Sequence, residues 1–252
     1  MSDYDLEWYN SFFGPDYLKI YSHVFDFDQS NEQAKFVQDV LQLQAGDHAL
    51  DLCCGQGRIS IPLAKQGINM TGLDFSKEIL NMARLEASNA GVEFTAIEAD
   101  MREIPYVSEF DAVINVFTAF GYFYGDAENQ KVLNGVAKSL KKNGLALFDL
   151  LNRDWVVSNH IEREWRVAGD GTKFLEERNW DAFHGISHIK FTIMAPDGTT
   201  TETGHHIRLY VATEFTRMLE EAGLSVQQCF GGYDKSPFDI SGKRMIVIAQ
   251  KD

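Results

Sequence analysis

The sequence predicts an α/β fold: a doubly wound, mostly parallel seven-stranded sheet with helices on both faces, plus an inserted antiparallel β-meander. Three observations lead to this fold class. Strand-like and helix-like runs alternate over residues 47–150, a glycine-rich turn follows the first strand, and the pattern changes to period-two alternation after Asn152. Strands separated by helices of this length are typical of a parallel sheet, whereas period-two runs joined by tight turns are typical of antiparallel strands.

Aromatic side chains dominate the first segment, residues 1–31, and polar residues lie between them. Two interpretations of this segment stay open. It is either a helix packed on the edge of the sheet or a lid that closes over a ligand site. The aromatic residues concerned are Tyr4, Trp8, Tyr9, Phe12, Phe13, Tyr17, Tyr21, Phe25 and Phe27.

Residues 32–152 are predicted to form the core of the sheet, and a helix over Asn31–Leu43 leads into it because its apolar residues recur at helical spacing. Three further helices are predicted over Gly57–Lys65, from the N-cap Ser76 to Ala90 before Gly91, and over Asp126–Lys141. The apolar runs between the helices are predicted strands: His48–Cys53, Asn69–Leu73, Val92–Ile97, Phe110–Val116 and Leu145–Leu150.

Residues 153–210 are predicted to be the inserted meander, which would form either a roof over a substrate or a contact in a dimer. The stretch "APDGTT" is a hairpin turn signal between its last two strands. The period-two runs are Lys173–Trp180, Gly185–Met194 and Thr199–Tyr210. Residues 211–252 then complete the core with a helix over Thr213–Ala222 and two strands, Ser225–Gly231 and Arg244–Gln250.

The charge balance argues against a polyanionic partner, since 23 Lys and Arg against 37 Asp and Glu give a net charge of −14. Nucleic-acid-binding proteins usually carry a basic stripe that neutralises phosphates, and the sequence has none. We therefore expect no nucleic-acid and no membrane partner, and we leave monomer or homodimer open. The three cysteines have no metal-ligand spacing, so no metal is expected. The acidic N-terminus and the lack of a membrane-spanning apolar run favour a cytoplasmic protein.

The stretch "ALDLCCGQGRIS" suggests a ligand site at the end of the first strand. An apolar run reaches Asp51, and the chain then turns through Gly55 and Gly57. A glycine turn between a strand and a helix lets a ligand approach the backbone amides at the helix N-terminus. A dinucleotide site prefers G-x-G-x-x-G, but Ser60 stands at the last position here, so that match is incomplete.

Two acids follow the next two strands. Asp74, in "MTGLDFS", can accept hydrogen bonds from both hydroxyls of a ribose, although a helix-capping acid beside Ser76 is the alternative. Asp100, in "IEADMREIP", can accept from an adenine amino group while Met101 packs on the ring, and a surface acid is the alternative. The fourth strand then ends at Asn115-Val116, before a loop rich in phenylalanine.

These stretches, in this order, resemble the class I S-adenosylmethionine-dependent methyltransferase family. "LDLCCGQGR", "GLDFS", "EADMREIP" and "FDAVINVFTAFGYF" are similar to its four motifs, although Cys53 stands where the first glycine is usual. The resemblance implies that residues 32–152 are a Rossmann-like core that binds S-adenosylmethionine and releases S-adenosylhomocysteine. It also implies methyl transfer to nitrogen or oxygen of a small-molecule acceptor by in-line displacement. The alternatives are a non-catalytic cofactor-binding protein, a methyltransferase acting on RNA or protein, and a nicotinamide oxidoreductase.

The resemblance also assigns roles to residues. The implied cofactor contacts are Asp51, Gly55, Gly57, Asp74, Phe75, Asp100, Met101, Asn115 and Phe117. Pairing of Arg58 with the cofactor carboxylate is a separate inference, for which a solvated arginine at the helix start is the alternative.

Tyr122 and His206 are the candidate catalytic residues. Tyr122 follows the fourth strand and resembles the position of an active-site aromatic or histidine in small-molecule N-methyltransferases of the family. His205 and His206 should point to opposite faces of one strand, so only one can face the crevice. Plain packing for Tyr122, and exposure for the histidines, are the alternatives. The candidate substrate-binding residues are Tyr9, Tyr17, Tyr21, Tyr122 and Arg208.

Overall fold

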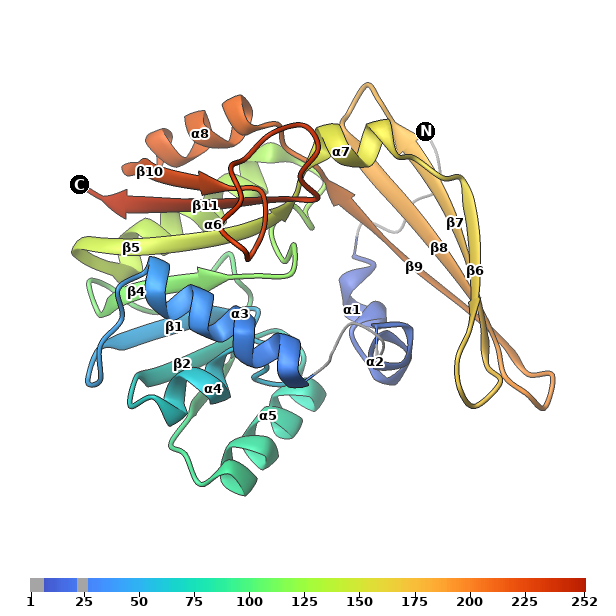
Figure 1. Cartoon of the computed structure of the whole chain (residues 1–252), viewed down its shortest axis with the longest axis horizontal. Coiled ribbons are helices and arrows are strands. Elements are labelled where there is room, and N and C mark those ends of the chain that lie inside the picture. Colours follow the sequence, from blue (N-terminus) through green and yellow to red (C-terminus); the bar gives the residue numbers. More distant parts are fainter. Residues whose placement is uncertain (1–6, 22–26) are drawn as a thin grey trace.

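The computed structural model describes residues 7–21 and 27–252, and it confirms the predicted fold class. A seven-stranded sheet has the order β10-β11-β5-β4-β1-β2-β3 (Figure 1). Strands β1 to β5 pair in parallel, whereas β11 is antiparallel to both of its neighbours. The strands are β1 (His48–Leu52), β2 (Asn69–Asp74), β3 (Thr95–Glu98), β4 (Phe110–Asn115), β5 (Leu140–Leu151), β10 (Leu224–Phe230) and β11 (Arg244–Lys251).

Helices cover both faces of this sheet because successive strand residues point to opposite sides. Leu50 packs in a cluster with Val132 and Phe215, whereas the preceding Ala49 packs with Val37 on the other face. The first face is covered by α6 (Asp126–Ser139) and α8 (Ala212–Glu221), and the second by α3 (Phe27–Val40) and α4 (Ser60–Lys65).

Local signals fixed the helix that follows β2. In α5 (Lys77–Ala90), Ser76 is the N-cap and its hydroxyl accepts from the Ile79 amide, while Gly91 ends the helix with φ +67°. Among the predicted strands, the largest shift of a boundary concerns β5, which begins five residues earlier than the predicted strand at Leu145. Asn143 adopts φ +63°, a conformation that asparagine tolerates, so the Asn-Gly pair lies within the strand region instead of closing α6.

The insertion folds as a separate antiparallel sheet in the order β6-β7-β8-β9, one strand more than the sequence predicted (Figure 1). The strands are β6 (Arg163–Val167), β7 (Lys173–Asp181), β8 (Ile186–Met194) and β9 (Thr200–Arg208). The strand β6 and the helix α7 (Arg153–Ser158) went unpredicted because neither buries an apolar face: β6 is an exposed edge strand, and no residue of α7 is buried.

Two short helices, α1 (Tyr9–Phe12) and α2 (Pro15–Tyr21), lie between the two sheets (Figure 1). Trp8, Phe12 and Ile20 are buried against Phe174 and Phe191 of the four-stranded sheet. The predicted aromatic segment is therefore a bridge between the sheets, and its Tyr4 and Phe25 lie outside the described residues. None of the helices in the described ranges has the length and hydropathy needed to cross a lipid bilayer.

Candidate functional site

A cavity with a volume of about 700 Å³, part of it open to solvent, lies at the carboxyl ends of β1, β2 and β4, beneath α1 and α2. Its lining includes nine of the residues singled out in the sequence: Tyr9, Tyr17, Gly55, Asp74, Phe75, Asp100, Met101, Phe117 and Tyr122. It also includes six that were not predicted to be site residues: Phe13, Cys53, Ile79, Val116, Ala119 and Phe123. Carboxyl ends of parallel strands are the usual ligand edge of such sheets, so this cavity is the candidate site.

The glycine turn after β1 forms one wall of the cavity. Gly55 and Gly57 have φ of +56° and +81°, and Cys53 also adopts a positive φ, +63°. The amides of Cys53 and Cys54 donate to the Leu73 carbonyl at 2.7 and 3.1 Å, which ties the turn to the end of β2. The left-handed backbone at Cys53 explains why glycine is usual in the motif at this position.

Asp74 connects the glycine turn to the start of α5. Its Oδ2 accepts from the Gly55 amide and its Oδ1 from the Ser76 amide, both at 2.9 Å. Burial raises the pKa of this carboxyl, while these amide hydrogen bonds oppose the rise. The capping alternative is thus partly correct, but the same side chain also lines the cavity.

Asp51 lies behind the turn and does not line the cavity. It is buried, the Ser60 hydroxyl donates to its Oδ2 at 2.5 Å, and its Oδ1 has no hydrogen-bond partner among the described residues. Burial raises its pKa from 3.8 to about 6, against the lowering effect of Ser60. The folded protein therefore binds this proton more tightly than the unfolded chain does, so stability falls as the pH rises through about 4 to above 6.

Substitution Asp51→Asn removes this titration. Between about pH 4.5 and pH 8 the wild-type protein is expected to lose roughly 2 kcal/mol of unfolding free energy through Asp51, and the variant is not. The variant should therefore gain that amount relative to wild type over this range. Urea unfolding at the two pH values measures this shift. Asp111→Asn is the matched control: burial opposes, but the His48 amide and Lys141 hold the pKa of Asp111 below its usual value. That carboxyl is ionised in the folded protein at both pH values, so this variant should be less stable than wild type by nearly the same amount at each. A pH-independent difference for Asp51→Asn would contradict the expectation.

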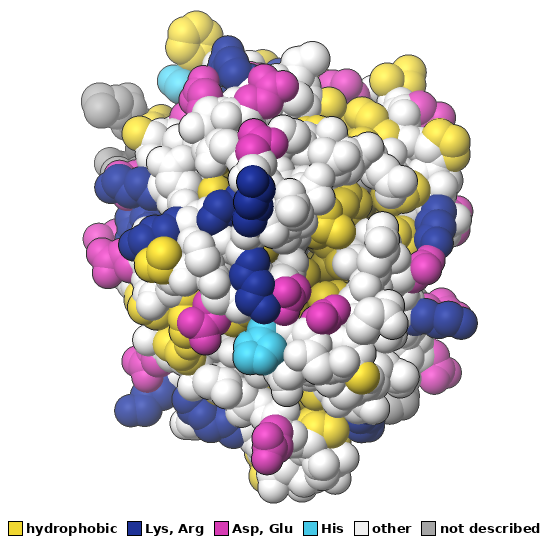
Figure 2. Space-filling model, turned by 90° about the vertical axis from the view of Figure 1, so that its left-hand side faces the viewer, with side chains coloured by type: hydrophobic (Ala, Val, Ile, Leu, Met, Phe, Trp, Pro, Cys, Tyr) yellow, Lys and Arg dark blue, Asp and Glu magenta, His cyan; other side chains and the backbone are white. Residues whose placement is uncertain are grey.

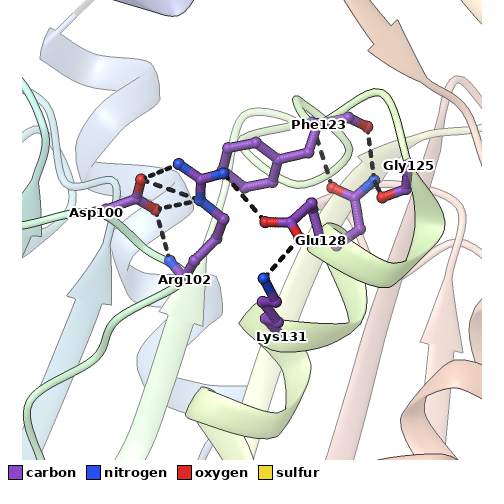
Figure 3. A network of polar contacts seen from close by, with 7 residues as sticks. Asp100, Arg102, Phe123, Gly125, Glu128 and Lys131 are labelled. Carbon is purple, nitrogen blue, oxygen red and sulfur yellow. Dashed lines mark hydrogen bonds and ion pairs between the residues drawn. The ribbon is translucent and has the colours of Figure 1, made fainter. Parts of the chain in front are cut away.

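Asp100 is held by a neighbour that the sequence analysis missed. Figure 3 shows Arg102 between Asp100 and Glu128. Asp100 accepts from the Arg102 amide at 2.8 Å and from its Nε at 3.0 Å, and the guanidinium carbon lies 4.2 Å from the centre of the Phe123 ring. Burial would raise the pKa of Asp100, but the Arg102 hydrogen bonds lower it below the usual value. A base two residues after the acid was the only sequence signal for this pair.

The chain after β4 borders the cavity through Val116, Phe117 and Ala119. Asn115 is buried behind them, and its Nδ2 donates to the Leu52 carbonyl at 3.0 Å. Arg58 does not line the cavity: its guanidinium donates to Gln33 and lies 5.8 Å from the Phe117 ring centre. The cavity lining therefore gives no support to the predicted pairing of Arg58 with the cofactor carboxylate. The alternative, a solvated arginine, is incomplete because the side chain bonds Gln33.

Aromatic rings form a large part of the cavity lining. Tyr122 lies 5.2 Å from Trp8 and 5.5 Å from Phe13 between ring centres, and Tyr9 lies 5.9 Å from Phe75. Burial raises the pKa of Tyr122 well above its usual value. The phenol is therefore protonated near neutral pH.

Three of the predicted catalytic and substrate-binding residues also lie outside the cavity lining, in addition to the predicted cofactor contacts Asp51, Gly57, Arg58 and Asn115. The Tyr21 hydroxyl is 3.0 Å from His205 Nε2, so it links α2 to β9. His206 is buried rather than exposed, with its ring 5.6 Å from Trp8 and 5.7 Å from His188. Arg208 bonds the Leu209 carbonyl at 2.6 Å and Glu214 at 3.1 Å, an arrangement that joins β9 to α8.

Comparisons with known proteins agree with this arrangement. Residues 49–144 match a family model described as a methyltransferase domain. The chain is 25% identical over 228 residues to a putative methyltransferase of Geobacillus sp. (strain WCH70), covering 86% of this chain and 90% of that protein.

Two solved structures share the fold. An S-adenosylmethionine-dependent methyltransferase from Clostridium acetobutylicum ATCC 824 superposes with a TM-score of 0.80 at 17% identity, covering 94% of this chain and 98% of that one. The sugar N-methyltransferase KedS8 from Streptoalloteichus sp ATCC 53650 superposes with a TM-score of 0.68 at 18% identity, covering 90% and 88%.

Proposed function

We propose that this chain, which belongs to the class I S-adenosylmethionine-dependent methyltransferases, transfers the cofactor's methyl group to a small-molecule acceptor. The observation that carries the proposal is the lining of the cavity, which combines a glycine turn, two carboxylates and several aromatic rings. Among the described lining residues there is no Lys, Arg or His. Acidic and aromatic lining groups fit a sulfonium, because aromatic faces attract positive charge. Arg102 already pairs with Asp100 and lies over Phe123, so Asp74 and the remaining rings are the groups available to the sulfonium.

Each wall of the cavity has a proposed role. Asp74 holds the ribose hydroxyls, and Gly55, with Gly57 behind it, lets the methionine end approach the backbone. Asp100, oriented by Arg102, lies at the adenine end with Met101. In these assignments the carboxylate oxygens of Asp74 and Asp100 accept hydrogen bonds from the ribose hydroxyls and the adenine amino group of the cofactor.

The bound cofactor supplies a methyl group that is already activated on sulfur. The protein therefore needs to orient the acceptor and exclude water, and orientation of this kind contributes roughly 7–11 kcal/mol. The helices α1 and α2, packed between the sheets, cover the cavity and limit the acceptor to a small molecule. Figure 2 shows acidic and basic side chains interspersed over one face, an arrangement unlike a nucleic-acid footprint.

Nitrogen is the favoured acceptor atom. A hydroxyl needs a base within hydrogen-bond reach, whereas a neutral amine attacks directly. Burial raises the pKa of Tyr17, Tyr122 and the Cys53 thiol, so none of these lining groups is a base near neutral pH. The two lining carboxylates, Asp74 and Asp100, are assigned to the cofactor in this proposal. Burial also lowers the pKa of His205 to about 3, but that ring lies outside the lining.

Calorimetry with S-adenosylmethionine and S-adenosylhomocysteine tests the cofactor, and release of S-adenosylhomocysteine in the presence of a panel of small amines and alcohols tests the acceptor. We expect both compounds to bind and amines to give turnover. Absence of binding would contradict the methyl-transfer proposal, and binding without turnover on any acceptor would favour a non-catalytic role.

Two variants of Tyr122 distinguish a role in orienting the acceptor from a role in proton transfer. General acid–base catalysis contributes roughly 10²–10⁴-fold, so a catalytic hydroxyl would show a loss of this size in Tyr122→Phe. We expect Tyr122→Phe to keep turnover within about threefold of wild type, and Tyr122→Ala to lose at least about tenfold because its ring packs on Trp8 and Phe13. Rates at saturating cofactor measure both variants, and a large loss in Tyr122→Phe would restore the acid–base role.

A further inference from the structure

The chain makes a strained turn where it leaves β4. Phe117 and Thr118 have φ of +59° and +58°, two consecutive left-handed residues that are not glycine. A β-branched residue such as threonine is rarely found in this region, and such conformations persist only where the surrounding structure holds them. Because Val116, Phe117 and Ala119 line the cavity, the turn sets the shape of one of its edges.

Asp149 of β5, which is buried, binds both amides of this turn. Its Oδ2 accepts from the Phe117 amide at 3.0 Å, and its backbone carbonyl accepts from the Thr118 amide at 2.9 Å. Two other donors complete the carboxylate: the Tyr233 hydroxyl lies 2.7 Å from Oδ2, and Arg244 Nε lies 2.6 Å from Oδ1. The carboxylate is therefore fixed from three sides.

Arg244 holds the same turn from the adjacent strand β11. Its Nη2 donates to Thr118 Oγ1 and to the Asp149 carbonyl, each at 3.0 Å. Burial and the neighbouring Asp149 carboxylate raise the pKa of Tyr233, so its hydroxyl remains a donor at neutral pH. Main-chain and side-chain groups of the turn are thus bonded to one ion pair behind the cavity wall.

We propose that Asp149 and Arg244 are positioning residues that keep the Phe117–Thr118 turn left-handed and so hold the cavity edge in the form that binds the cofactor. The inference rests on the proposed function. Neither residue lines the cavity, and they act through the backbone of the turn. Without the ion pair, the turn relaxes toward negative φ, and the Phe117 ring leaves its place beside Tyr21, 5.6 Å away between ring centres.

The test compares dissociation constants for S-adenosylhomocysteine by calorimetry with urea midpoints. Asp149→Asn keeps the size of the side chain but removes the charge, and we expect the dissociation constant to rise by about tenfold. Asp111→Asn is the matched control, because Asp111 also accepts from a backbone amide, that of His48, and pairs with a base, Lys141, but at the opposite end of β4. The Asp111→Asn control should lower the urea midpoint without changing the dissociation constant for S-adenosylhomocysteine.

A second substitution distinguishes positioning from general destabilisation. Thr118→Gly in the Asp149→Asn background should bring the dissociation constant back to within about threefold of wild type, since glycine adopts positive φ without steric strain. If Asp149→Asn does not fold, Tyr233→Phe and Arg244→Lys replace it, with a rise expected in both. Wild-type affinity in these variants overturns the positioning role, whereas a wild-type protein that binds no S-adenosylhomocysteine overturns the proposed function instead.

Discussion

Asp74→Ala is expected to weaken S-adenosylmethionine binding by about 100-fold, because a hydrogen bond to a charged group contributes roughly 1.5–3 kcal/mol and this carboxylate makes several. In the structure it accepts from the Gly55 and Ser76 amides while it lines the cavity. The substitution therefore removes the proposed ribose acceptor and also releases the glycine turn. Calorimetric titration of the purified variant measures the loss.

Glu98→Ala is the matched control for this prediction. Glu98 pairs in register with Asp74 on the neighbouring strand β3, but it is exposed and does not line the cavity. Its removal should leave affinity unchanged. The affinity of Asp74→Asn should lie between the affinities of Asp74→Ala and Glu98→Ala, since the amide oxygen can still accept from the Gly55 amide. Equal affinity in wild type and Asp74→Ala would reject the ribose assignment.

Gly121→Ala is expected to lower the unfolding free energy by about 3 kcal/mol, because overpacking and a left-handed non-glycine residue both destabilise. Gly121 has φ +98°, and a Cβ added there would lie 2.4 Å from the carbonyl oxygen of Arg208. The Arg208 amide also donates to the Gly121 carbonyl at 2.8 Å. The clash is with backbone, so it can be relieved only by separating β9 from the loop that carries Tyr122.

Gly125→Ala tests whether the effect belongs to this contact. Gly125 lies on the same loop, at the N-cap of α6, with φ −104° and no atom within 4 Å of an added Cβ. Its replacement should change stability by less than about 1 kcal/mol. Urea unfolding of both variants gives the comparison, and equal midpoints would show that the contact between β9 and the loop does not stabilise the protein.

The sheet could be predicted from the sequence because its strands carry their own signals. Buried parallel strands are continuous apolar runs, and β1 is buried at four of its five positions. Strands β6 to β9 were recognised only where alternation was visible, so the exposed edge strand β6 was missed. The N-terminal aromatics were noticed, but their place between two sheets depends on contacts with residues more than 150 positions away, such as Phe174 and Phe191.

The sequence by itself determined the order of the elements and the ends of strands at which Gly55, Asp74, Asp100 and Phe117 meet, because parallel topology brings the carboxyl ends of strands to one edge. Only the tertiary structure decided which side chains hold them. Arg244 bonds Asp149 across 95 residues and Tyr21 meets His205 across 184, and such partners follow no local period or spacing. Hydrogen-bond partners are fixed by which groups are buried together, and that is a property of the packed chain.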